Sequence, residues 1–135
     1  METYKAYSVY AIQSPDRLKV VAIAEPRPQT RKNFAKLHSV DDTLVFKTWQ
    51  ELIVASAEII NTIGKRLADA VIIAVQDHQH AEVTKAFAEQ GYHILCEKPM
   101  ATSIQECLAM ENVVKQSGKI FGMGHGMSVI LCPLT

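Results

Sequence analysis

The sequence predicts an α/β fold in which a doubly wound, mostly parallel sheet carries helices on both faces. Three observations lead to this prediction. Helical and strand-like segments alternate along the chain, beginning with a helix and ending with a strand. The helical segments are long enough to form the crossovers that parallel strands require. Finally, two of the strand-like runs are almost continuously apolar, as is typical of strands buried on both faces of a parallel sheet.

The composition is that of one ordinary globular domain. The chain has 135 residues, of which 48% are hydrophobic and 21% are charged, so it has enough apolar surface for a packed core and is unlike a disordered tail. Fourteen basic residues balance fourteen acidic ones, for a formal net charge of zero. This balance disfavours nucleic acid or an acidic membrane surface as a partner.

The cysteines and apolar runs bear on the compartment. The three cysteines form no C-x-x-C pair for zinc, and their odd number does not suit a disulfide framework. The first residues contain no apolar core of a secretory signal. The longest uninterrupted apolar run, Ala70 to Val75, is six residues, far below the roughly 20 residues that span a bilayer. We therefore expect a cytoplasmic protein without a membrane partner.

The first elements follow from periodicity and from proline. Tyr4, Tyr7 and Ala11 share one face of an opening helix, which Pro15 ends. Residues 18–24 are rich in β-branched side chains and predict a buried strand. A helix over residues 29–37 follows, with Pro28 in its first turn, where a missing N–H group costs nothing.

The middle of the chain repeats the alternation. Val45 and Phe46 predict a short strand. Thr48 and Glu51 have the spacing of a capping box at the start of an apolar helix that Gly64 ends. Residues 70–75 predict the most deeply buried strand, followed by a helix over residues 81–90.

The last elements complete the pattern. Residues 92–96 predict a strand, and Thr102 with Gln105 is expected to cap a helix that runs to Gly118. Residues 119–123 predict a final short strand. Sheets of this kind usually open with a strand, whereas this chain opens with a helix, so we expect one strand to be missing.

Glu25 is the first candidate site residue. It follows the strand over residues 18–24, where a carboxylate at the carboxyl edge of the sheet can accept hydrogen bonds from both hydroxyls of an adenosine ribose. The alternative is an ordinary loop or helix-cap carboxylate. Arg27 lies close enough in sequence to receive a 2′-phosphate, so NAD and NADP both remain open, with Glu25 favouring NAD.

Glycine patterns supply no phosphate-binding loop. The G-x-G-x-x-G motif expected between a first strand and a first helix is absent. Gly122, Gly124 and Gly126 have the wrong third spacing, and we expect a flexible turn there.

Glu97, Lys98 and Pro99 follow the predicted strand over residues 92–96. A lysine at this edge can orient a hydroxylated or anionic substrate, or polarise an oxygen during hydride transfer. The alternative is a solvated Glu and Lys beside a loop proline.

Histidine and cysteine side chains add weaker candidates. His78 and His80 flank one residue, but they lack a third ligand at suitable spacing, so we predict no metal and expect a helix-capping or ligand-edge histidine. Cys96 is expected to be a small buried hydrophobe.

Four segments together closely resemble the glucose-fructose oxidoreductase / inositol dehydrogenase (Gfo/Idh/MocA) family. They are residues 20–26, 70–75, 80–82 and, above all, Leu95-Cys96-Glu97-Lys98-Pro99-Met100-Ala101. The resemblance covers roughly residues 18–125. It implies an amino-terminal NAD(P)-binding Rossmann domain joined to an α/β domain built on an open antiparallel sheet. It also implies hydride transfer between nicotinamide and a sugar, inositol or related polyol.

The same resemblance implies roles for individual residues. Lys98 resembles the active-site lysine of the family's E-K-P motif, and Glu25 resembles its ribose-binding acid. The remaining expected cofactor-binding residues are Arg27, Gln76, His80, Glu97 and Pro99. The family usually has a small polar residue and a proline where this chain has Gln76 and Asp77.

Both ends depart from the family pattern. The resemblance implies that residues 1–125 are a partial Rossmann domain without its first strand and glycine loop, and that residues 126–135 are an unrelated tail. The catalytic Asp and His of the family belong to its second domain. We therefore expect a catalytically incompetent, marginally stable nucleotide-binding fragment of an enzymatic parent that acts on a sugar or polyol.

Two alternatives remain open. The first is a non-catalytic interaction module that pairs with an intact relative, or with its own copies, through an open sheet edge. The second is an α/β domain that binds no cofactor.

Overall fold

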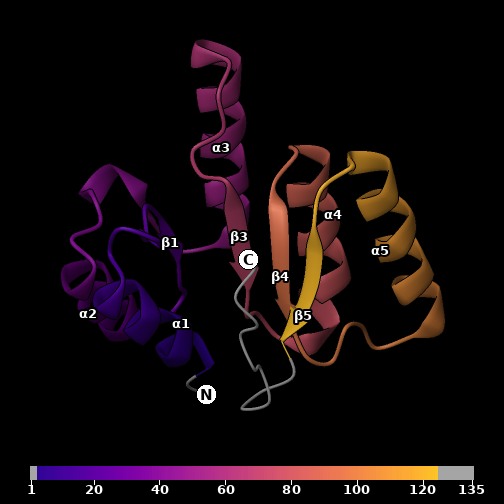
Figure 1. Cartoon of the computed structure of the whole chain (residues 1–135), viewed down its shortest axis with the longest axis horizontal. Coiled ribbons are helices and arrows are strands. Elements are labelled where there is room, and N and C mark those ends of the chain that lie inside the picture. The colour runs from indigo at the N-terminus through magenta and orange to yellow at the C-terminus, as the bar shows by residue number, and fades with distance from the viewer. Residues whose placement is uncertain (1–2, 125–135) are drawn as a thin grey trace. The chain divides into compact units, whose positions relative to one another are not determined.

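The computed structural model of the chain describes residues 3–124, with side chains from residue 7 onward (Figure 1). The chain divides into two compact units between Ala68 and Asp69. Helices and strands alternate within both units, and every strand pair is parallel. The predicted α/β class with parallel sheets is therefore confirmed.

The first unit contains three helices around a two-stranded sheet. Its elements are α1 (Thr3–Gln13), β1 (Ile23–Ala24), α2 (Pro28–Leu37), the 3-10 helix η1 (Asp42–Leu44), β2 (Val45–Phe46) and α3 (Trp49–Ile63). Ile23 pairs with Val45 and Ala24 with Phe46. The strand predicted over residues 18–24 is thus reduced to its last two residues, because β2 offers only two partners.

The ends of these helices follow the sequence signals. Pro28 occupies the first turn of α2, and the side chain of Thr48 caps α3 in a reciprocal capping box with Glu51. Gly64 ends α3 with a φ angle of 70°, in the left-handed region that favours glycine. All three predictions are confirmed.

The second unit is a three-stranded sheet in the order β3-β4-β5. Its elements are β3 (Ala70–Ile73), the 3-10 helix η2 (Asp77–Gln79), α4 (His80–Glu89), β4 (His93–Glu97), α5 (Ile104–Ser117) and β5 (Phe121–Gly124). The three arrowheads point to the same end in Figure 1, and α4 and α5 lie side by side on one face of the sheet. The carboxyl ends of β3, β4 and β5 therefore share one edge.

Apolar side chains from α4, α5 and the sheet form the core of this unit. Phe87 on α4 packs edge-on against Tyr92 with ring centroids 5.5 Å apart. The buried apolar residues here are Ile73, Val83, Phe87, Ala88, Tyr92, Ile94, Cys96 and Met110.

Burial of β3 differs from the prediction. The strand is Ala70–Ile73 rather than residues 70–75, and Ile72 is 40% exposed although Ile73 is only 2% exposed. Within residues 3–124, β3 pairs with β4 alone. Its other edge therefore has no strand beside it in this part of the chain.

The predicted cap of α5 is wrong by one residue. Ser103, not Thr102, is the N-cap, and its hydroxyl accepts a hydrogen bond from the Glu106 N–H at 3.2 Å. Gln105 has no part in the cap. The carboxylate of Glu106 instead accepts hydrogen bonds from the Thr102 N–H and hydroxyl, at 3.0 and 2.7 Å. Thr102 and Ser103 both have a hydroxyl group, so the sequence alone does not decide which of them is the N-cap of α5.

The prediction of a flexible turn at the glycine-rich segment is also wrong. Gly122 and Gly124 lie inside β5, where they pair with Leu95 and Glu97 of β4. The extended pairing fixes both glycines in a strand. Gly126, His125 and Cys132 lie outside the described residues.

No helix in the described range is long and apolar enough to cross a bilayer.

Candidate functional site

The predicted site residues lie just beyond the carboxyl ends of parallel strands in both units. Glu25 follows β1 in the first unit, while Gln76 follows β3 and Lys98 follows β4 in the second. Ligands of open parallel sheets bind at such edges.

Glu25 is engaged by its neighbour Arg27. The guanidinium donates two hydrogen bonds to the carboxylate, from Nε to Oε1 at 2.9 Å and from Nη2 to Oε2 at 3.0 Å. The Arg27 backbone N–H adds a third hydrogen bond to Oε1 at 2.8 Å. The Glu25 side chain is 15% exposed and that of Arg27 is 61% exposed, so the pair lies at the surface with the carboxylate on its inner side.

This pairing controls the charge of Glu25. The hydrogen bond from the Arg27 side chain lowers the pKa of the Glu25 carboxyl group, while partial burial opposes that effect. Arg31, on α2, donates from Nη1 to the Glu25 carbonyl at 2.6 Å and to the Pro26 carbonyl at 3.1 Å. The loop is thus held from α2, with an ionised carboxylate at its end.

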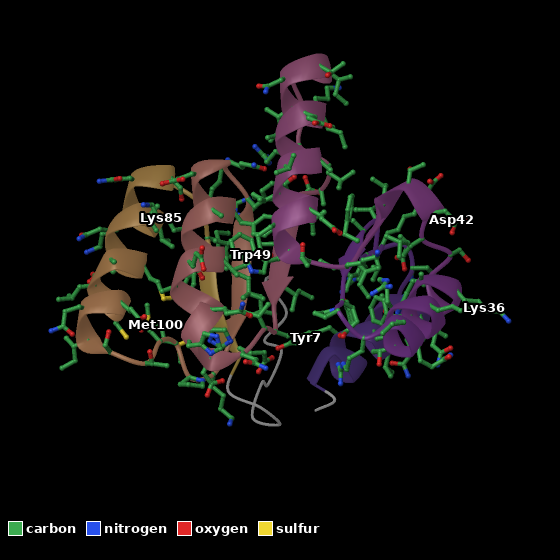
Figure 2. The ribbon with its side chains drawn as sticks, turned by 180° about the vertical axis from the view of Figure 1, so that it is seen from behind. Tyr7, Lys36, Asp42, Trp49, Lys85 and Met100 are labelled. Atoms are coloured by element: carbon green, nitrogen blue, oxygen red, sulfur yellow. The ribbon has the colours of Figure 1, made fainter. Side chains whose placement is uncertain are left out.

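In the second unit, β4 leads directly into the Glu97-Lys98-Pro99 turn. Glu97 is 7% exposed, whereas Lys98 and Pro99 are exposed. The peptide bond between Lys98 and Pro99 is cis. Met100, labelled in Figure 2, follows the turn. An exposed ammonium therefore stands directly beyond a buried strand.

His80 lies beneath this turn as the first residue of α4, and it is only 1% exposed. Its Nδ1 atom lies 2.6 Å from the carbonyl oxygen of Pro99. Its Nε2 atom lies 3.2 Å from the carbonyl oxygen of Val75. Both ring nitrogens thus face backbone carbonyls, and a contact between this side chain and a cofactor stays a prediction.

Gln76 and the residues after it form the β3–α4 connection. Gln76 is exposed, and its carbonyl accepts a hydrogen bond from the Gln79 N–H at 2.8 Å. His78 is exposed on η2. Among the described residues, no three His, Cys, Asp or Glu side chains are grouped so as to hold a metal ion.

Cys96 is a buried residue of β4, as predicted, with no exposed surface. Burial raises the pKa of its thiol to about 11, and the hydroxyl of Thr84 opposes this only in part. Its sulfur donates to the Glu97 carbonyl at 3.4 Å. This thiol is unsuited to act as a nucleophile.

The structure therefore brings together Glu25 with Arg27 in the first unit, and His80 with Pro99 in the second. Two contacts at these loops had not been predicted. Arg31 could have been suspected from its place one turn into α2, close to the loop that carries Glu25. The contact of His80 with Pro99 joins residues 19 positions apart, and no local pattern signals it.

Comparison with known proteins identifies the family to which this fold belongs. Residues 4–125 match a family described as oxidoreductases with an NAD-binding Rossmann fold, Gfo/Idh/MocA. A 2,7-anhydro-N-acetylneuraminate hydratase of Escherichia coli is 35% identical over 66 residues, which are 49% of this chain and 18% of that protein. An inositol 2-dehydrogenase of Saccharopolyspora erythraea is 39% identical over 56 residues, which are 42% of this chain and 17% of that protein.

Among solved structures, a levoglucosan dehydrogenase in complex with NADH and levoglucosan superposes with a TM-score of 0.68 and 27% sequence identity. The superposition covers 88% of this chain and 31% of that one. The chain thus matches less than one third of the length of each of these three proteins.

Proposed function

Because the chain belongs to the Gfo/Idh/MocA family of NAD-binding Rossmann-fold oxidoreductases, we propose that it is the nucleotide-binding part of an enzyme that oxidises or reduces a sugar, inositol or related polyol. The observation that carries this proposal is Glu25. Its carboxylate stands at the carboxyl end of β1 and is held there by three hydrogen bonds from Arg27. The names of its relatives, which include an inositol dehydrogenase and a levoglucosan dehydrogenase, support the substrate class.

Glu25 is proposed to accept hydrogen bonds from the adenosine ribose hydroxyls of the cofactor. NAD is preferred over NADP because the Arg27 guanidinium is already paired with this carboxylate. A 2′-phosphate would have to displace that pairing while lying close to the Glu25 charge. NADP remains the alternative, since an Arg27 released from Glu25 could bind the phosphate.

Lys98 is the proposed catalytic residue. The nicotinamide ring supplies the hydride chemistry. The exposed ammonium of Lys98 would orient the reacting hydroxyl or carbonyl oxygen of the substrate and stabilise negative charge on it. Glu97 and Pro99 would shape the turn that presents Lys98, and Gln76 would border the cofactor from the β3–α4 connection.

The chain by itself is proposed to be catalytically incompetent. Its 135 residues contain no G-x-G-x-x-G loop for the pyrophosphate. Proton transfer is proposed to depend on the Asp and His that the family resemblance assigns to a second domain.

A second candidate function is a non-catalytic module that pairs with an intact relative or with its own copies. The supporting observation is β3, whose apolar sequence suits an interior strand although Ile72 is 40% exposed. A sheet edge of this kind can accept a further strand. Size-exclusion chromatography of the chain, alone and mixed with an intact relative, tests this alternative.

The direct test of nucleotide binding is thermal unfolding with increasing NAD or NADP, with calorimetric titration as a second measure. A ligand that binds only the folded chain stabilises it by about 2.7 kcal/mol at 100 times its Kd. We expect both nucleotides to raise Tm, NAD more than NADP, and Glu25→Ala to reduce the NAD effect. A transition that neither nucleotide shifts would reject the proposal for this chain.

A further inference from the structure

Two loops at the carboxyl edge of the β3-β4-β5 sheet meet at one side chain. Val75 lies just after β3, and Pro99 lies just after β4. The His80 imidazole contacts the carbonyl oxygens of both, at 3.2 Å and 2.6 Å. One ring therefore connects the two loops to the first residue of α4.

The ring is itself fixed by the packing of its helix. His80 is 1% exposed, and α4 also buries Val83 and Phe87 against the core of the second unit. A side chain so enclosed has few alternative rotamers. Through its contact with this ring, the Pro99 carbonyl is held in a fixed position relative to the core of the unit.

The two contacts are not equivalent. A neutral imidazole has one N–H donor, so it can donate to only one of the two carbonyls. The distance to Pro99 is the shorter by 0.6 Å, taken as 3.2 minus 2.6 Å. The shorter distance favours a proton on Nδ1 and a hydrogen bond to the turn that carries Lys98.

We propose that His80 is a positioning residue that holds the Glu97-Lys98-Pro99 turn in place through the Pro99 carbonyl, without touching the cofactor. This inference rests on the proposed function, because it concerns the turn that presents Lys98. Because Lys98 is proposed to act on the substrate oxygen at the nicotinamide, we expect the effect of His80 to be on the nicotinamide part of the ligand, through the turn that follows β4.

Two variants separate the contacts. The amide nitrogen of Asn lies where His carries Nδ1, so His80→Asn keeps a donor for Pro99. The longer Gln places its amide nearer the position of Nε2, so His80→Gln keeps a donor for Val75 and loses the one for Pro99. His78→Asn is the matched control, because His78 is exposed and only two residues away.

The first measurement compares the affinities of the full chain for NADH and for ADP-ribose, which lacks the nicotinamide. We expect His80→Gln to lower the affinity for NADH about tenfold more than the affinity for ADP-ribose, because one buried hydrogen bond is lost. His80→Asn and the control should stay within about twofold of wild type. An unchanged ratio in His80→Gln, or the same loss in a folded His80→Asn, would overturn the inference. Wild-type protein that binds neither ligand would instead reject the proposed function.

The second measurement needs no ligand and covers the case of a variant that does not fold. Long-range 15N–1H NMR spectra of the wild-type imidazole should show the Nδ1–H tautomer of His80. An Nε2–H tautomer would place the hydrogen bond on Val75 and overturn the inference.

Discussion

The Arg27 guanidinium and the Glu25 carboxylate form a two-pronged ion pair, with N–O distances of 2.9 and 3.0 Å. The two residues are separated only by Pro26, and the Arg27 backbone N–H joins the same carboxylate. Parallel hydrogen bonds of this kind fix orientation as well as charge. The acid proposed to bind ribose is therefore oriented before any ligand arrives.

Arg27→Ala should raise the pKa of Glu25, because the side-chain hydrogen bond from Arg27 is the main cause of its lowered value. The effect can be read from the carboxyl carbon of Glu25 by NMR titration, with Lys32→Ala on α2 as a control. A Glu25 pKa unchanged by Arg27→Ala would contradict the assigned cause.

The same pair should make stability depend on pH. Since the folded-state pKa of Glu25 is lowered, its stabilising effect is present above the unfolded-state pKa and is lost as the pH falls through the folded-state pKa. Arg27 is largely exposed, so we expect Arg27→Ala to cost less than about 1 kcal/mol at pH 7. Urea unfolding should show this cost shrinking below about pH 4, near the ordinary pKa of a glutamate. A cost that grows on acidification would contradict the sign.

Glu25→Ala should shift cofactor preference towards NADP. The variant removes the proposed ribose ligand and releases the Arg27 guanidinium for a 2′-phosphate. We expect the NAD/NADP affinity ratio to fall by about tenfold or more, measured by calorimetry. Glu25→Ala combined with Arg27→Ala is the control and should lose the gain for NADP. Equal ratios in wild type and Glu25→Ala would argue against both roles.

Ser103→Ala should destabilise the chain by about 1 kcal/mol, the usual cost of an N-cap hydroxyl. Thr102→Ala should cost less, because its hydroxyl bonds only an exposed carboxylate. Chemical unfolding of the two variants decides the register of the cap. The reverse order of the two costs would restore the cap at Thr102.

Cys96 should resist alkylation in the folded chain. With a thiol pKa of about 11, roughly one molecule in a thousand carries the reactive thiolate at pH 8. Mass spectrometry after iodoacetamide treatment should find Cys107, which is half-buried, modified before Cys96. Cys96 should react only after unfolding in urea, and its early modification in native protein would contradict the burial.

The alternation of helices and strands could be predicted because periodicity, proline and glycine are local signals. Pro28, the Thr48 box and Gly64 mark helix ends through the chemistry of the residues themselves. Strand length could not be predicted in the same way. Only two residues of the apolar run before Glu25 find partners, and pairing depends on a distant segment.

The residues of the candidate site also differ in how far the local sequence predicts them. Glu25 and Lys98 could be picked from sequence because they directly follow apolar strands. The ion pair between Arg27 and Glu25 could not be predicted, since a side chain two residues from the acid can turn either to the carboxylate or to solvent. The backbone contacts of His80 depend on loops after two different strands, so they appear only once the fold is known.

His80 contacts only main-chain carbonyl oxygens, so the side chains of Val75 and Pro99 contribute no atom to either contact. The residue at position 75 can therefore change during evolution, or be exchanged in a library, while its carbonyl oxygen stays available to His80. Substitutions at position 80 are then expected to be more harmful than substitutions at position 75. A deep mutational scan should find position 80 intolerant and position 75 permissive to apolar replacement, an asymmetry that pairs of interacting side chains do not show.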